Sequence, residues 1–302
     1  MSDGADDGLA SRRADVSGMG RATEGRRTPA RPRLEPVAAA VRDADCLDRI
    51  VDAGPVVDRA FGTERRLFTP DGALDVRVAS LPDAAPPAAA RAVATQHRRW
   101  NSADDIDGVV PVVETGLADR PWVVTAAVDR DPPLDQVDLG TALDEALTLS
   151  GTVAALHDRG LIHGAIAPAC IAHPPAGAGA GRALTDIGLL DVYRRHHEVT
   201  ALVDPRYAPP EIFDDDGLVD RSTDVYGLAA LCYRRCTGTA PRPDGAAGVE
   251  GPVVRPSIRE PGLPPELDDI LLEALAADPY ERFDTVSDFR AAIAGLLESE
   301  SF

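Results

Sequence analysis

The chain of 302 residues contains no lysine: its 31 basic residues are all arginines, against 50 acidic residues, and the formal net charge is −19. Nucleic acids and anionic membranes both attract clustered positive charge, so a surface this acidic disfavours them as partners. No run approaches the roughly 18 apolar residues of a membrane helix, and the N-terminus lacks an apolar signal region. These absences predict a cytoplasmic protein that binds neither nucleic acid nor membrane.

Aromatic residues and cysteines are also scarce. Aromatic residues make up 4% of the chain, so alanine, valine and leucine must fill its core. The cysteines show no CxxC spacing, and we expect small buried thiols rather than zinc ligands at Cys46, Cys170, Cys232 and Cys236. We attribute the acidic excess to a halophilic type of composition, in which high salt screens the repulsion between like charges.

The pattern along the chain changes at two places. Residues 1–40 are rich in Gly, Ala, Asp and Arg without periodicity, which predicts a disordered tail. Short β-like runs and one helix, Pro87–Trp100, follow over about 45–128, and helical patterns dominate from 139 onward. The expected strands are Arg65–Phe68, Asp75–Ala79, Val109–Glu114 and Trp122–Val128, with a hairpin turn at Pro70–Gly72, and the later helices are Asp138–Asp158, Ser222–Cys236, Pro265–Asp278 and Val286–Leu297. A small β-rich lobe (41–128) before a larger helical lobe (129–302) predicts an α+β bilobal fold.

Five segments of the second half carry a specific resemblance. They read LHDRGLIHGAIAPACIAHP (156–174), LTDIGL (184–189), DPRYAPPEIF (204–213), STDVYGLAALCYRRCTGTAP (222–241) and LPPELDDILLEALAADPYERF (263–283). In this order they resemble the catalytic loop, the DFG and APE motifs, the helix that begins with a buried Asp, and the closing Asp-Pro-x-x-Arg of protein kinases. The resemblance covers about residues 45–298, is strongest from 140 onward, and implies the bilobal protein-kinase-like fold of the Ser/Thr type.

The resemblance also shows which chemical groups are replaced. In the motif H-R-D-x-x-x-x-N, the Asp accepts the proton of the substrate hydroxyl and the Asn holds a metal ion. Here Ala165 stands at the position of the base, Ala167 at that of a lysine and Cys170 at that of the Asn. Alanine accepts no proton, and a thiol is a poor ligand for Mg²⁺. No catalytic residue is therefore expected.

The nucleotide-binding features are weak as well. Arg77 is the nearest substitute for the lysine of the third strand, unless it is an ordinary sheet arginine, and Gln96 stands where its helical Glu partner is expected. Residues 53–62 lack the GxGxxG spacing. The segment Trp122–Val128 resembles the hinge that binds adenine through its backbone, and it includes Thr125. Asp186 is either the retained metal ligand or a carboxylate that only bonds loop backbone. We therefore expect no cofactor, with weak binding of ATP and Mg²⁺ through Arg77, Thr125 and Asp186 as the alternative.

Residues that support the fold are kept. The resemblance implies that His163 packs at the catalytic-loop turn, that Asp224 holds the backbone of this loop, and that Glu211 and Arg282 form an ion pair. The first hypothesis is therefore a pseudokinase that acts by binding a still unknown protein partner. An atypical or weakly active Ser/Thr kinase that uses Arg77 and Asp186, and a scaffold with a purely structural role, are the alternatives.

Overall fold

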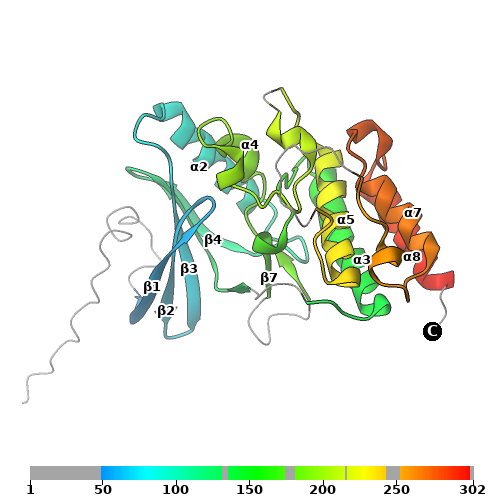
Figure 1. The fold of residues 1–302 in the computed structure, drawn as a ribbon. Coiled ribbons are helices and arrows are strands. Elements are labelled where there is room, and N and C mark those ends of the chain that lie inside the picture. Colours follow the sequence, from blue (N-terminus) through cyan, green and yellow to red (C-terminus); the bar gives the residue numbers. More distant parts are fainter. Residues whose placement is uncertain (1–48, 131–134, 174–180, 215, 243–251, 300–302) are drawn as a thin grey trace, which may run out of the picture. The chain divides into compact units, whose positions relative to one another are not determined.

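The computed structural model of the protein describes residues 49–130, 135–173, 181–214, 216–242 and 252–299. The tail expected over 1–40 and the thiol of Cys46 lie outside the described residues. The described residues form an antiparallel sheet with one helix, followed by a mainly helical part (Figure 1). The predicted α+β bilobal fold is thus confirmed. Within these residues, no helix is long and apolar enough to cross a lipid bilayer.

The sheet has five strands in the order β1-β2-β3-β5-β4. Its elements are β1 (Asp52–Arg59), β2 (Gly62–Thr69), β3 (Gly72–Ala79), α2 (Pro87–Asn101), β4 (Val112–Leu117) and β5 (Pro121–Ala126). Strands β2 and β3 form the expected hairpin, in which Thr69 pairs with Gly72 across the turn. The amphipathic helix α2 buries Val93 and Trp100. These apolar side chains attach the helix to the core and fix its position beside the sheet.

The strand boundaries differ from the prediction at several places, most clearly at β4 and β1, and β5 ends at Ala126 instead of Val128. Strand β4 begins at Val112 instead of Val109, because the backbone of Val110 pairs with Leu184 of the second lobe, with 3.0 Å between N and O. Strand β1 was not predicted, since most of its side chains are exposed and give no alternating pattern. It occupies most of the region in which a glycine-rich loop was sought.

The second lobe is built around helix α5. Its elements are β6 (Asp129–Arg130), α3 (Leu139–Asp158), η2 (Pro168–Cys170), β7 (Ile171–His173), β8 (Ala183–Leu184), α4 (Leu189–Tyr193), η3 (Val199–Ala201), η4 (Pro210–Phe213), α5 (Arg221–Thr237), α6 (Pro256–Arg259), α7 (Pro265–Ala274), η5 (Pro279–Glu281) and α8 (Val286–Ser299). Asp138 and Asp220 cap the first turns of α3 and α5 with their carboxylates, which explains why both helices begin within one residue of the predicted position. Helix α7 ends at Ala274, four residues earlier than predicted.

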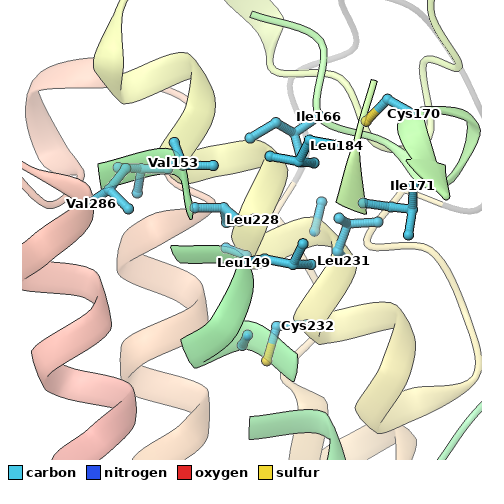
Figure 2. Close-up of a cluster of buried hydrophobic side chains, with 14 of the residues drawn as sticks. Leu149, Val153, Ile166, Cys170, Ile171, Leu184, Leu228, Leu231, Cys232 and Val286 are labelled. Atoms are coloured by element: carbon cyan, nitrogen blue, oxygen red, sulfur yellow. The ribbon is translucent and has the colours of Figure 1, made fainter. Parts of the chain in front are cut away.

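The core of this lobe joins α3, α5 and α8 to the catalytic-loop segment. Figure 2 shows Val153 of α3, Leu228 of α5 and Val286 of α8 in one apolar cluster that also contains Ile166. Cys170, Cys232 and Cys236 are free and buried, as expected of small apolar thiols.

Helix α5 approaches the catalytic-loop segment closely at Gly227. A Cβ atom at this position would lie 2.7 Å from Cβ of Ile166 and 2.8 Å from its carbonyl oxygen. Glycine at 227 therefore lets the helix support the segment that contains Ala165 and Cys170.

Candidate functional site

Charged side chains occupy the inner face of the β2–β3 hairpin. Glu64 pairs directly with Arg77, and Arg66 with Asp75. Because successive side chains of a strand point to opposite faces, these four side chains share one face. Glu64, Asp75 and Arg77 are all buried. Opposite charges at directly paired positions attract each other, so this face consists of two cross-strand ion pairs.

The first ion pair extends into the second lobe. Nη2 of Arg77 donates to Oε2 of Glu64 at 2.6 Å, and Nη1 of Arg77 contacts Oδ1 of Asp186. Nε of Arg59 donates to the other oxygen of Glu64 at 3.2 Å. Arg59, Glu64, Arg77 and Asp186 thus form a row of alternating charge, which we call the inner charge row. It links the sheet directly to residues Asp186–Gly188, which we call the DIG segment.

The backbone around Asp186 is unusual. Its φ of 68° is the left-handed conformation, and no other non-glycine residue in the described ranges has a positive φ. The hydroxyl of Thr185 donates to Oδ2 of Asp186 at 2.8 Å. This conformation is unfavourable for an L-residue, and the contacts of the carboxylate hold it in place.

The second ion pair, between Arg66 and Asp75, bonds to the backbone of the segment that was expected to be the hinge. Nε and Nη2 of Arg66 donate to the two carboxylate oxygens of Asp75 at 2.9 and 3.0 Å. The backbone N–H of Val128 donates to Oδ2 of Asp75 at 3.1 Å, and the carbonyl of Val128 accepts from Arg66. Nη1 of Arg66 also reaches Asp129 at 3.0 Å. The hydrogen bond to Asp75 raises the pKa of the Arg66 guanidinium above its ordinary value.

Both backbone polar groups of Val128 are therefore bonded to side chains of the sheet. The sequence leaves the backbone of Trp122–Val128 open to a purine; at Val128, both backbone polar groups are engaged by Asp75 and Arg66. Thr125 lies three residues earlier, in β5, and is buried; its hydroxyl is 3.5 Å from the carbonyl oxygen of Asp75. Thr125 thus lies against the charged hairpin.

Helix α2 contacts the DIG segment through Gln96. Its Nε2 donates to the carbonyl of Ile187 at 3.4 Å. Gly188 has a φ of 70°, and a Cβ atom there would lie 2.0 Å from Nε2 of Gln96. Only glycine allows this approach. Gln96 does not contact Arg77; instead, the acidic partner of Arg77 is Glu64 of β2.

His97, the next residue of α2, is buried beside this network. Burial lowers its pKa from 6.5 to about 3, and the positive charge of Arg77 adds to the effect. Below pH 6.5 the unfolded chain takes up a proton that the folded protein does not, so stability falls as the pH falls toward 3. The expected loss from this group is about 1.4 kcal/mol per pH unit within that window.

We expect the His97 imidazole to remain neutral from pH 7 to pH 4 in an NMR titration of its ring signals. In the variant Arg77→Met the midpoint should rise, yet stay below 6.5, because burial is the larger cause. A wild-type midpoint near 6.5 would contradict the buried, neutral imidazole.

The catalytic-loop segment is fixed by Asp224 of α5. The fully buried carboxylate accepts hydrogen bonds from the backbone N–H groups of His163 at 2.9 Å and Gly164 at 2.7 Å. Nε2 of His157 lies 2.8 Å from the same carboxylate. His163 is completely buried, and its Nδ1 accepts from the N–H of Ala165 at 3.3 Å. The segment thus keeps a defined conformation.

The thiol at the position of the metal-binding Asn bonds to its own turn. Sγ of Cys170 accepts from the N–H of Ala167 at 3.2 Å and donates to the carbonyl of Ala167 at 3.0 Å. The sulfur therefore closes the short helical turn Pro168–Cys170.

Glu211 and Arg282 form a bidentate ion pair. Nη1 and Nη2 of Arg282 each donate to one oxygen of Glu211 at 2.8 Å. The side chain of Arg282 is 0% exposed and that of Glu211 10%. Nε of Arg282 also donates to the carbonyl of Ala276, and its guanidinium lies 5.0 Å from the ring of Tyr226. This pair joins the segment before α5 to the loop after α7.

Reasoning from the sequence found Arg77 and Asp186 but missed Glu64, Arg66 and Asp75. The signal was present, since charged residues occupy alternate positions in two paired β-like runs. In an ordinary two-stranded hairpin such residues face solvent, so alternation alone does not identify a buried charged face.

The geometry defines the protein kinase fold, and comparison with solved structures agrees. The crystal structure of the PknI kinase domain of Mycobacterium tuberculosis matches 82% of this chain and 96% of that domain, with a TM-score of 0.56 and 21% identity. A double mutant of that domain, C20A_R136A, matches with a TM-score of 0.57 and 22% identity. No protein-family model matches the chain.

Curated relatives show the same relation in sequence. The serine/threonine-protein kinase PknJ of Mycobacterium tuberculosis is 30% identical over 217 residues, which are 64% of this chain and 36% of that protein. PknB of the same species is 29% identical over 222 residues, covering 64% of this chain and 34% of that protein. The chain spans about a third of the length of these relatives. The structure thus has the fold of a protein kinase, and the sequence is similar to these serine/threonine-protein kinases.

Proposed function

We propose that this domain is a pseudokinase, a catalytically inactive member of the family that acts by binding a protein partner. One observation carries the proposal: Asp75 and Arg66 bind the backbone N–H and carbonyl of Val128, where a purine would bind. A nucleotide would have to break these hydrogen bonds and separate a partly buried ion pair. Separating this pair would leave the buried carboxylate of Asp75 without its counter-charge, at a cost of a few kcal/mol.

The residues present do not fit Mg²⁺ and ATP. The two carboxylates that lie in the phosphate region, those of Glu64 and Asp186, are already neutralised by Arg77 and Arg59. Ala165 offers no base, and the Cys170 sulfur bonds to Ala167. A kinase accelerates phosphoryl transfer mainly by positioning the reactants and by stabilising charge. The base that positions the substrate hydroxyl and the Asn that holds a metal ion are both replaced here, by Ala165 and Cys170.

Binding of a partner is supported by contacts that hold the two lobes together without a ligand. Besides the inner charge row, the hydroxyl of Tyr193 donates to the carbonyl of Phe61 at 2.5 Å, and Nε2 of His197 lies 3.0 Å from the carbonyl oxygen of Ser80. Lobes fixed in this way present one surface to a partner at no further entropic cost. The cytoplasmic location is part of this proposal.

A weakly active Ser/Thr kinase is the second candidate. The contact between Arg77 and Asp186 favours it, because both residues lie where a phosphate-binding cation and a metal ligand would act. The two candidates differ in one measurable property, the binding of nucleotide.

We expect no rise in melting temperature with millimolar ATP and Mg²⁺, and no transfer of phosphate from ATP, for the wild-type protein in high KCl. A ligand at about 100 times its Kd would stabilise the fold by about 2.7 kcal/mol, which is easily detected. The double variant Arg66→Val, Asp75→Ala removes both charges and releases Val128, so it should bind adenosine more tightly than the wild type.

Phosphate transfer that is lost in Asp186→Asn would establish the second candidate instead. Equal adenosine affinity of the wild type and the double variant would show that Arg66 and Asp75 do not exclude a purine.

A further inference from the structure

A cavity of about 350 Å³ lies beside the catalytic-loop segment. Its walls come from Phe61 in the turn between β1 and β2, from Ala165 and Ala167, and from Leu202, Tyr207 and Ile212. Four of these side chains, Phe61, Leu202, Tyr207 and Ile212, are themselves nearly fully buried, so the walls are held in place by the core. The volume is at the lower end of small-ligand pockets, about 300–1,000 Å³.

The charged residues on the wall are all paired with neighbours. The lining includes four of them, Arg59, Arg77, Asp186 and Asp204. The first three belong to the inner charge row, and Asp204 pairs with Arg206 at 2.6 Å. The cavity therefore offers no unmatched charge to a ligand, and a charged ligand would lose its hydration without gaining a counter-ion.

We propose that this cavity binds a small, uncharged, mostly apolar molecule of about the size of two fused rings. The site goes beyond the proposed binding of a protein partner and does not depend on it. Alanine at 165 and 167 leaves room next to the loop, and apolar side chains supply most of the remaining contact. Burial of apolar surface, at about 25 cal/mol per Å², provides the affinity.

The test uses 2-naphthol as the probe, titrated into the full chain by calorimetry. We expect one site, and at least about tenfold weaker binding of the matched anion 2-naphthoate and the matched cation 2-naphthylmethylammonium. Ala165→Leu fills the cavity and should weaken the binding of 2-naphthol by about tenfold or more. Ala92→Leu, at an exposed position of α2, is the matched control and should leave binding unchanged.

A second measurement uses the wild type alone and does not depend on the folding of any variant. Cys170 lines the cavity, whereas Cys232 and Cys236 are buried elsewhere in the core. Bound 2-naphthol should slow the alkylation of Cys170 by iodoacetamide, read by mass spectrometry, with no change at Cys232 and Cys236. No binding to the wild type, tighter binding of either charged probe, full affinity in a folded Ala165→Leu, or equal protection of all three thiols would each overturn the proposal.

Discussion

Replacing Arg282 by alanine is expected to lower the free energy of unfolding by about 3–5 kcal/mol, because it leaves the carboxylate of Glu211 buried without a counter-charge. The guanidinium also donates to the carbonyl groups of Ser222 and Ala276, and both would lose this donor. Urea denaturation followed by circular dichroism measures the change. Glu211→Gln should cost a similar amount, since it leaves Arg282 unpaired at a side chain that is 0% exposed.

The double variant shows whether Glu211 and Arg282 stabilise the fold as a pair or independently of each other. If Glu211 and Arg282 stabilise the fold by pairing, Glu211→Gln with Arg282→Ala costs clearly less than the sum of the single changes. Arg195→Ala is the matched control, because Arg195 pairs with Asp191 on the exposed surface of α4 and the loop after it. Such a pair contributes about 0.3–0.5 kcal/mol. Additive losses of the size of this control would show that Glu211 and Arg282 act as ordinary surface charges.

Asp224→Ala is expected to cost about 4 kcal/mol, because it removes the acceptor of two buried backbone donors. Each donor left without an acceptor costs about 1–3 kcal/mol. The affected N–H groups belong to His163 and Gly164, at the start of the catalytic-loop segment. Urea denaturation gives the total cost, and amide hydrogen exchange at these two residues reports whether the loop opens locally.

The matched control for Asp224 is on the same helix. Asp220 caps the first turn of α5 through a hydrogen bond from the N–H of Ser222 at 2.8 Å. Asp220→Ala should cost about 1 kcal/mol, the ordinary value for an N-cap. If Asp224→Ala costs no more than this and leaves exchange at His163 and Gly164 unchanged, then Asp224 does not hold the loop.

The second lobe was more predictable than the first. Helices α3 and α5 follow from their periodic apolar residues and from the capping carboxylates of Asp138 and Asp220, all of which are local signals. Helix α7 ends early at Ala274, where a turn leads into the loop that contributes Arg282. Local patterns therefore predict where the helices form and begin, while the residue at which a helix ends depends on the loop that follows.

The inner charge row and the Arg66–Asp75 pair depend on contacts between distant residues, which local patterns do not contain. Alternation places Glu64 and Arg66 on one face of β2, but it does not reveal that β3 presents Arg77 and Asp75 opposite them. The contact of Arg77 with Asp186 requires the packing of the two lobes. Likewise, β4 starts late because Val110 pairs with Leu184. Tertiary contacts thus decide both features.

The inner charge row also limits how this sequence can change over evolutionary time. Replacing Arg77 alone by an apolar residue removes the cation that contacts the buried carboxylate of Asp186, whereas replacing Arg77 and Asp186 together leaves Glu64 paired with Arg59. A lineage that replaced this row would therefore pass through less stable single-step intermediates, or acquire two changes together. Populations with little spare stability seldom cross such a barrier, so the inner charge row is expected to persist among the nearest descendants of this chain.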